Sequence, residues 1–352
     1  MIPVLQVNDI RCRYGDTLAV DGTTFVLREG ELACLLGPSG CGKTSVLRAI
    51  AGFQKLDTGT VVMDGKTISN IHGNVAPEHR NVGMVFQDHA LFPHLTVAQN
   101  VAAGVLTRSA AEQERIVGRT LERVGLSGLR NRYPHELSGG QQQRVALVRA
   151  LAPGPRLLLM DEPFSSLDVE LRQKLGQEMH DLLKETRTTC ILVTHDQQDA
   201  FTFGEMVGVM RNGAIEQWDS PYNLYHQPAG PFVADFIGEG VFLNGVVIDG
   251  KHVKTELATL RSNIPHQHPA NAPVRVLVRP DDIVHDDDSP LTARIKKKAF
   301  RGESYLYTLE LPSGQELLSL VHSHHNHDVG TPLGIKIEVK HLVVFPAAEG
   351  TH

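Results

Sequence analysis

Short apolar runs in the first two thirds of the chain predict buried strands at Leu32–Leu36, Val82–Phe86, Leu157–Met160 and Cys190–Thr194. Polar residues or glycines bound each run, which is typical of parallel strands buried on both faces. Amphipathic stretches between the runs predict helices, one of them with an apolar stripe made by Leu171, Leu175, Met179 and Leu182. Strands that alternate with helices indicate an α/β fold with a mostly parallel sheet.

Local signals add antiparallel structure to this core. Asp64-Gly65 and Asn212-Gly213 are typical of hairpin turns, and Ser109 with Glu112 forms a capping box at the start of a helix. Beyond residue 240 the pattern changes to a period of two, as in Ile335, Ile337 and Val339, which predicts half-buried strands. We therefore expect an α/β domain at 1–239, with a helical arm at about 88–150, and an all-β domain at 240–352.

Composition narrows the classes of protein. The 352 residues carry a formal net charge of −6, which argues against a nucleic-acid partner. The 4 cysteines form no CxxC pair, so we expect buried thiols and neither a zinc site nor disulfides. Apolar runs long enough to cross a membrane and a signal peptide are both missing, and the expected location is the cytoplasm.

A phosphate-binding loop is the strongest chemical signal. Residues 37–44, GPSGCGKT, match the pattern GxxxxGK[ST] and lie between a predicted strand and a predicted helix. The glycines let backbone amides turn toward phosphate oxygens, and the start of the helix adds its positive dipole end. Lys43 is expected to reach the β- and γ-phosphates, and Thr44 to ligate Mg²⁺.

Two further patterns fit a nucleotide site. Asp161 and Glu162 close an apolar strand, where a carboxylate can hold Mg²⁺ and its neighbour can orient or deprotonate water. Ser138 and Gln141 of LSGGQ form a capping box, but Gly139 and Gly140 weaken the helix that it opens. These glycines instead allow a ligand to approach helix-terminal amides, which indicates a second phosphate-binding element.

These motifs occur in the same order as in the ATP-binding subunits of ABC transporters, which the chain closely resembles over essentially its whole length. The resemblance implies a P-loop NTPase cassette and a site for ATP and Mg²⁺. It implies that Tyr14 stacks on adenine and that the phosphate loop binds ATP through Gly37, Ser39, Gly40, Cys41, Gly42, Lys43, Thr44 and Ser45. The signature residues of the family correspond to Ser138, Gly139, Gly140 and Gln141.

The same resemblance assigns roles near the γ-phosphate. Glu162 is implied as the catalytic carboxylate, His195 as the switch histidine, and Gln87 as a residue that touches both the metal and a membrane partner. The metal ligands are then Thr44, Gln87 and Asp161, and Asp168 belongs to the D-loop at 165–168. The activity implied is ATP hydrolysis coupled to transport.

The resemblance also implies partners. Two copies of the chain would pack head to tail, with each ATP between the phosphate loop of one copy and the signature of the other. This homodimer would dock on integral-membrane permease subunits at the cytoplasmic face of the bacterial inner membrane, and a periplasmic solute-binding protein would act indirectly.

The tail narrows the group further. The motif Val278-Arg279-Pro280-Asp281-Asp282-Ile283 is similar to one in the OB-like regulatory domain of importers for sugars, polyamines and ferric iron. Overall the chain looks most like the ferric-iron importer ATPases of Gram-negative bacteria, with polyamine or sugar import as the alternatives. A non-transport ABC ATPase and a signalling role of the β-domain stay open, whereas a P-loop kinase would not explain LSGGQ.

Two clusters in the tail have competing interpretations. His322, His324, His325 and His327 suit either a transition-metal site or an exposed loop, and the loop is favoured because no carboxylate or cysteine lies between them. The basic run from Arg294 to Arg301 is interpreted as a solvated strand face, because the tail as a whole is nearly neutral.

Overall fold

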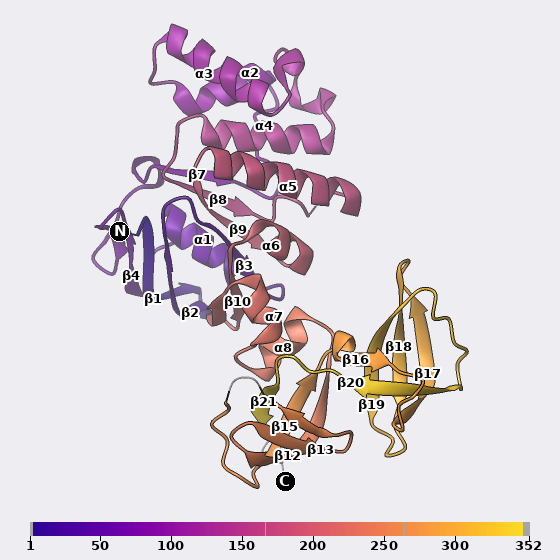
Figure 1. Ribbon diagram of the computed structural model, residues 1–352. Coiled ribbons are helices and arrows are strands. Elements are labelled where there is room, and N and C mark those ends of the chain that lie inside the picture. Colours follow the sequence, from indigo (N-terminus) through magenta and orange to yellow (C-terminus); the bar gives the residue numbers. More distant parts are fainter. Residues whose placement is uncertain (1–2, 166, 263–264, 348–352) are drawn as a thin grey trace. The chain divides into compact units, whose positions relative to one another are not determined.

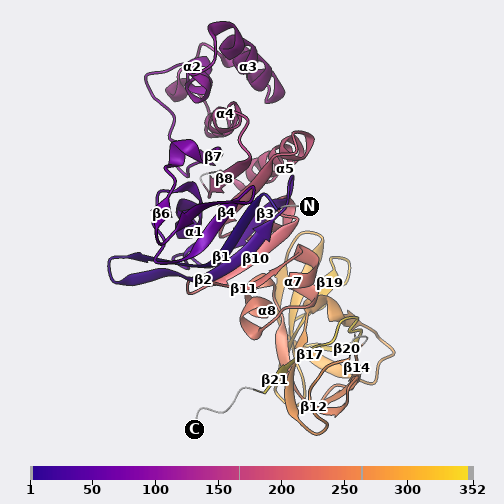
Figure 2. The same cartoon turned by 90° about the vertical axis from the view of Figure 1, so that its left-hand side faces the viewer.

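The computed structural model describes residues 3–165, 167–262 and 265–347 (Figure 1, Figure 2). The chain forms two compact units, residues 1–221 and 222–352. The predicted boundary at 239/240 lies later than this division, because the helix α8 (Pro231–Ile237) packs with the second unit. Whether 1–239 and 240–352 fold independently stays a prediction.

A six-stranded sheet forms the centre of the first unit, in the order β11-β10-β3-β9-β8-β7. All its neighbouring strands are parallel except β10 and β11, which form a hairpin. The strands are β3 (Leu32–Leu36), β7 (Val82–Val85), β8 (Leu157–Asp161), β9 (Thr189–Thr194), β10 (Met206–Arg211) and β11 (Ala214–Asp219). This confirms the four predicted strands to within one residue at each end, and the hairpin at Asn212-Gly213.

A second, antiparallel sheet has the order β2-β1-β4-β5-β6. Its strands are β1 (Leu5–Tyr14), β2 (Thr17–Leu27), β4 (Thr58–Met63), β5 (Lys66–Asn70) and β6 (Gly73–Asn74). Helix α1 (Lys43–Ala51) contacts strands of both sheets, and its apolar side chains share one core with them. The helix that begins in the phosphate loop is therefore fixed between two sheets.

The remaining helices of the first unit are α2 (Val97–Ala102), α3 (Ala110–Arg123), α4 (Gly139–Leu151), α5 (Val169–Glu185) and α6 (Gln197–Phe203). Helices α2, α3 and α4 fall within the range predicted for the helical arm and have a small apolar core of their own. Both views show these three helices grouped away from α1 (Figure 1, Figure 2). The predicted capping box of Ser109 and Glu112 is confirmed at the start of α3.

Arg80 is buried beside the end of α1, and the sequence patterns did not predict this. Its side chain is only 1% exposed, and Gly52 leaves room for it because a side chain there would collide with the guanidinium. The guanidinium donates hydrogen bonds to carbonyl oxygens of Ala49, Ile50, Ile68 and Val75 and to side-chain oxygens of Ser69 and Asn74. Burial lowers the pKa of Arg80 to about 10, so the group stays charged at neutral pH.

We expect Arg80→Met to destabilise the first unit strongly. Each buried carbonyl that loses its donor costs about 1–3 kcal/mol, and several are lost together. In a unit of this size a loss of about 3 kcal/mol lowers the melting temperature by roughly 6–12 °C. A thermal melt of the full chain measures the change, with the exposed Arg115→Met as the matched control. Equal melting temperatures for the two variants would contradict the role given to Arg80.

The second unit is mainly β-structure, as predicted. One sheet has the order β14-β13-β12-β15-β21 and the other β16-β20-β17-β18-β19, and one apolar core includes residues of both. The strands are β12 (Val241–Asp249), β13 (His252–Thr255), β14 (Thr259–Arg261), β15 (Pro273–Val278), β16 (Ile283–His285), β17 (Thr292–Phe300), β18 (Ser304–Glu310), β19 (Glu316–His322), β20 (Pro332–Ile337) and β21 (Val343–Pro346). Helix α7 (Pro221–His226) precedes α8.

The fold also shows where the basic run and the cysteines lie. The basic run lies on β17 except for Arg301, which follows the strand. Lys296 forms ion pairs with Glu310 and Glu316, as suits a solvated strand face. The cysteines Cys12, Cys34, Cys41 and Cys190 are buried, as predicted, and each is a free thiol. Among the described residues, every helix is too short or too polar to cross a membrane.

Candidate nucleotide-binding site

The phosphate loop follows β3 and requires glycine at specific points. Gly42 has φ 105°, and a side chain there would run into the carbonyl oxygen of Ala19. A side chain at Gly37 would collide with the carbonyl oxygen of Met210. Gly42 caps α1 without any side-chain hydrogen bond, so the first amides of α1 face the loop without competition from a capping side chain.

Lys43 points back into the loop that precedes it. Its ammonium group donates to the carbonyl oxygens of Gly37 at 2.8 Å and Pro38 at 2.9 Å, and the residue is only 5% exposed. A buried cation beside helix-terminal amides gives this part of the loop a positive potential. This arrangement is suited to phosphate groups.

Thr44 and Asp161 come together across 117 positions of sequence. The Thr44 hydroxyl donates to Oδ1 of Asp161 at 2.9 Å. Asp161 is 8% exposed, and burial raises its pKa, although the hydrogen bond from Thr44 opposes this effect. A divalent cation would favour the ionised carboxylate, and the oxygens of a hydroxyl and a carboxylate are ligands that Mg²⁺ accepts. The two residues therefore fit the predicted metal site.

The strand order explains why the next residues meet. Strand β9 lies between β3 and β8, so His195, just after β9, lies beside Glu162, just after β8. Nδ1 of His195 and Oε2 of Glu162 are 3.2 Å apart. The amide of Glu162 donates to the carbonyl of Val193, and Glu162 has φ 45°, a left-handed conformation that glutamate rarely adopts. The backbone thus holds this carboxylate in a defined direction.

Gln87 is linked to Glu162 by two hydrogen bonds through Ser165. Its amide donates to the Ser165 hydroxyl at 3.4 Å, and that hydroxyl donates to the carbonyl oxygen of Glu162 at 3.0 Å. Gln87 lies two residues beyond the end of β7, which neighbours β8. The carboxyl ends of four adjacent strands therefore supply Lys43, Gln87, Asp161, Glu162 and His195.

Sequence patterns did not predict the charged residues Asp196 and Asp199 that follow His195, or their contact with Arg172. Arg172 of α5 forms an ion pair with Asp196 at 2.9 Å, and the Thr194 hydroxyl donates to Asp199 at 3.1 Å. Burial, and then the charge of Asp196, raise the pKa of Asp199 to about 6. No sequence pattern connects α5 with the turn after β9. Arg172 meets Asp196 because α5 packs against α6.

The signature element begins α4, as predicted, and its capping box is present. The Ser138 hydroxyl accepts a hydrogen bond from the Gln141 amide, and the Gln141 side chain accepts one from the Ser138 amide. The two glycines differ. Gly139 is exposed, and a Cβ there would have only an ordinary contact with Leu167 at 3.7 Å, whereas a Cβ on Gly140 would approach Leu175 to 3.2 Å. Gly139 suits ligand approach, and Gly140 also serves the packing of α4 on α5.

The remaining residues that were predicted to bind ATP differ in their exposure and their contacts. Tyr14, at the end of β1, is 43% exposed, as a stacking residue requires. Ser39 and Gly40 are exposed in the phosphate loop, while Cys41 is buried and Ser45 is half-buried. Asp168 is the N-cap of α5 and accepts a hydrogen bond from the Leu171 amide. Ser166 of the D-loop lies outside the described residues.

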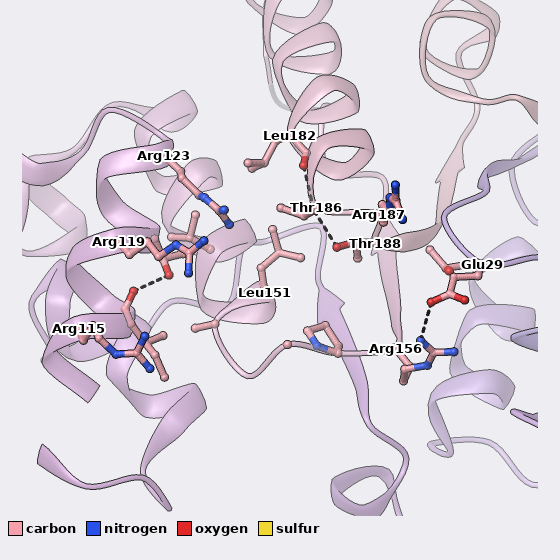
Figure 3. A pocket seen from close by; sticks show the side chains of 17 residues that line it. Glu29, Arg115, Arg119, Arg123, Leu151, Arg156, Leu182, Thr186, Arg187 and Thr188 are labelled. Carbon is pink, nitrogen blue, oxygen red and sulfur yellow. Dashed lines mark hydrogen bonds and ion pairs between the residues drawn. The ribbon is translucent and has the colours of Figure 1, made fainter. Parts of the chain in front are cut away.

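A separate pocket of about 500 Å³ lies elsewhere in the first unit (Figure 3). Arg115, Arg119 and Arg123 of α3 line it together with Arg156. Arg156 is already paired with Glu29 at 2.9 Å and with Asp64 at 3.0 Å. The lining includes no residue of the predicted nucleotide site, so this pocket is not the place where the ATP motifs meet.

Comparison with known families agrees with this geometry. Residues 20–165 match the family model described as ABC transporter, and residues 276–345 match the one described as TOBE domain. Among solved structures, the chain is similar to CbiO1 from Clostridium perfringens, part of an ABC transporter complex, with TM-score 0.59 and 27% identity over 65% of this chain and 93% of that chain. An ATP-binding cassette of another ABC transporter gives TM-score 0.60 and 25% identity over 67% and 99%.

Curated relatives cover nearly the whole chain. The spermidine/putrescine import ATP-binding protein PotA of Aliivibrio fischeri is 40% identical over 96% of this chain and 93% of its own length. PotA 2 of Pseudomonas aeruginosa is 38% identical over 91% of both chains. PotA of Bacteroides fragilis is 38% identical over 95% of this chain and 72% of its own length.

Proposed function

Because this chain belongs to the ATP-binding proteins of ABC importers, with a C-terminal TOBE domain, we propose that it drives the uptake of a polyamine of the spermidine or putrescine class. As a member of that family it binds ATP with Mg²⁺ and hydrolyses it. The named relatives favour the polyamine alternative over the ferric-iron prediction, which has no support among them. The observation that carries the polyamine assignment is this similarity across both units.

In the proposed site, the phosphate loop and Lys43 bind the β- and γ-phosphates. The loop amides and the Lys43 ammonium group replace the water that a phosphate loses on binding. Thr44 and Asp161 would hold Mg²⁺, with Gln87 as the third proposed ligand, and the ion would neutralise charge on the phosphate oxygens. Tyr14 would stack on the adenine ring.

Glu162 is the proposed base for the attacking water. Its backbone hydrogen bond to Val193 and its contact with His195 limit the directions that the carboxylate can take. A fixed carboxylate can orient a water molecule and accept its proton. His195 would then contact the γ-phosphate and couple its presence to the position of Glu162.

Two copies of the chain are needed for a complete site in this proposal. The signature helix α4 lies in the helical arm, whereas the phosphate loop lies between the two sheets of the first unit (Figure 1). Exposed Ser138 and Gly139 would meet the γ-phosphate held by the other copy. Permease subunits and a solute-binding protein would complete the importer at the inner membrane.

The solute prediction is tested in a deletion strain of the host. We expect the strain to lose uptake of labelled spermidine or putrescine while ferric-iron uptake stays unchanged. The wild-type gene should restore polyamine uptake, because hydrolysis is coupled to transport, and a His195→Ala gene should not. Loss of iron uptake with normal polyamine uptake would contradict the assignment and leave the ATPase activity in place.

A further inference from the structure

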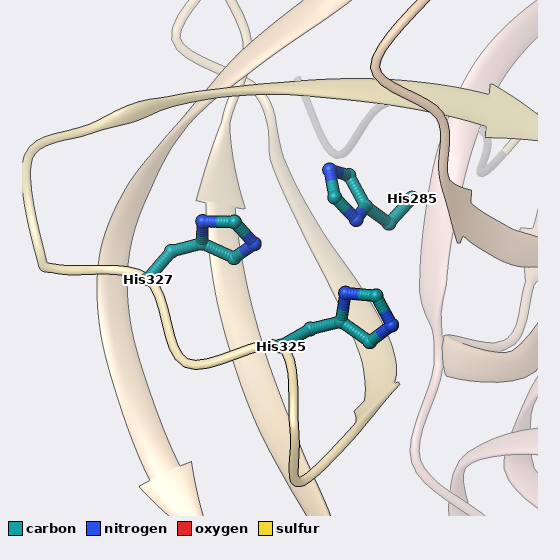
Figure 4. Close-up of side chains that lie close together, drawn as sticks. All are labelled: His285, His325 and His327. Atoms are coloured by element: carbon teal, nitrogen blue, oxygen red, sulfur yellow. The ribbon is translucent and has the colours of Figure 1, made fainter.

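Three imidazole rings meet in the second unit, on elements that are separated in sequence (Figure 4). His285 ends the short strand β16, and His325 and His327 lie in the loop between β19 and β20. One ring nitrogen from each residue lies within 4.8 Å of the others. We propose that these three residues bind a divalent transition-metal ion, with Zn²⁺ as the best fit.

The contacts leave nitrogen atoms available for a metal. Nε2 of His285 lies 2.9 Å from a carboxylate oxygen of Asp287, which leaves Nδ1 of His285 as the metal-binding atom. Metal-binding histidines commonly use their second nitrogen to bond a carboxylate in this way. Nε2 of His327 is buried and has no hydrogen-bond partner among the described residues. A buried nitrogen without a partner is unfavourable, and a metal ion would satisfy it.

The loop that carries two of the ligands is held by a buried tyrosine. The hydroxyl of Tyr307 on β18 donates to the carbonyl oxygen of His325 at 2.7 Å and accepts from the amide of His327 at 3.0 Å. Lys298 donates to the carbonyl oxygen of His327 at 3.1 Å. The backbone of both histidines is therefore fixed from the protein core, and only side-chain rotations are needed to close the site.

The size of those rotations is small. Nitrogen atoms around a tetrahedral zinc are about 3.3 Å apart, since each Zn–N bond is about 2.0–2.1 Å. The ring centres of His285 and His327 are 5.0 Å apart, and those of His285 and His325 are 5.4 Å apart. The ligand nitrogens themselves lie within 4.8 Å of one another. Reaching the zinc spacing therefore requires each pair of nitrogens to approach by about 1.5 Å at most.

The ligand type selects the class of metal. Imidazole suits Zn²⁺, Cu²⁺, Ni²⁺ and Co²⁺, whereas Mg²⁺ and Ca²⁺ require oxygen ligands. Three protein ligands leave one tetrahedral position for water or an added ligand. The metal would connect β16 to the β19–β20 loop, so that binding stabilises this part of the second unit.

The structure also divides the histidine run that the sequence showed. His322 and His324 stack on each other with ring centres 4.9 Å apart and are not members of the three-residue cluster. His285, more than 35 positions earlier, takes their place. The pair His322 and His324 therefore supplies a matched control in the same region of the chain.

The test uses the full chain without a polyhistidine tag, freed of metal by a chelator. Zinc is titrated against a coloured competing chelator, and cobalt is added separately to record the ligand-field spectrum of the bound ion. We expect one tight site per chain. We expect His327→Ala and His285→Ala to weaken it by at least about 10-fold. Asp287→Asn should weaken it by roughly 10-fold, because a neutral amide oxygen replaces the charged carboxylate that the second nitrogen of His285 contacts.

The controls separate binding from folding. His322→Ala with His324→Ala should leave zinc affinity and the cobalt spectrum unchanged. His325 is exposed, so His325→Ala should fold normally, and it decides the matter if His285→Ala does not fold. Zinc should raise the melting temperature of wild type and not of His325→Ala. Equal zinc affinity in wild type and in the His325→Ala and His327→Ala variants would overturn the proposal.

Discussion

We expect Lys43→Ala to lose tight binding of MgATP. The Lys43 ammonium group lies in the curve of the phosphate loop, where it bonds the carbonyl oxygens of Gly37 and Pro38. On ATP binding it would turn to the β- and γ-phosphates, and each charge-assisted hydrogen bond lost there costs about 1.5–3 kcal/mol. Two such bonds correspond to a loss of affinity of about 100-fold or more. Equilibrium titration with a fluorescent ATP analogue measures the change.

The control is Lys55→Ala, which removes an exposed lysine of the same unit. It should bind MgATP like wild type, which excludes a general effect of net charge. Thermal melts of both variants should match wild type within a few degrees, so that loss of binding is not loss of folding. Unchanged affinity in a folded Lys43→Ala protein would remove the phosphate loop from its proposed role.

The sequence predicted the members of the nucleotide site because each one lies next to a strong local signal. Glycines, an apolar strand and a helix surround Lys43, and an apolar strand precedes both Asp161 and His195. Such signals are local, since strands are short and loops follow them directly. The contact of Glu162 with His195 could not be predicted from such local signals, because it depends on β9 lying between β3 and β8 in the sheet. That strand order is not encoded in any local pattern.

Residues whose partners are distant in sequence were missed for the same reason. Arg80 in a polar loop gave no sign that it would be buried against the end of α1. His285 stood alone in its segment, and the packing of β16 against β20 and β19 brings it near the loop that holds His325. The ferric-iron prediction rested on overall impression, and a solute that need not touch the ATPase leaves little trace in its residues.

The largest effect on activity is expected from Glu162→Gln. The variant keeps the shape of the side chain but cannot accept a proton from water, and loss of a positioned base costs about 100- to 10,000-fold in rate. Binding of MgATP should stay normal, because Lys43, Thr44 and Asp161 are unchanged. Glu170→Gln, an exposed glutamate in the first turn of α5, is the matched control and should hydrolyse ATP at the wild-type rate.

The same variant tests the two-copy site. With the γ-phosphate intact between the phosphate loop of one copy and Ser138 of the other, Glu162→Gln should accumulate as an ATP-bound dimer in size-exclusion chromatography. Adding Ser138→Arg should abolish the dimer by steric block. Adding Ser138→Ala removes the N-cap hydroxyl, at a cost of about 1 kcal/mol, but leaves the amides at the start of α4 accessible, so it should weaken the dimer less than Ser138→Arg does. A Glu162→Gln protein that stays monomeric at high protein and ATP concentration would contradict the composite site, and a dimer that survives Ser138→Arg would place the signature helix away from the interface.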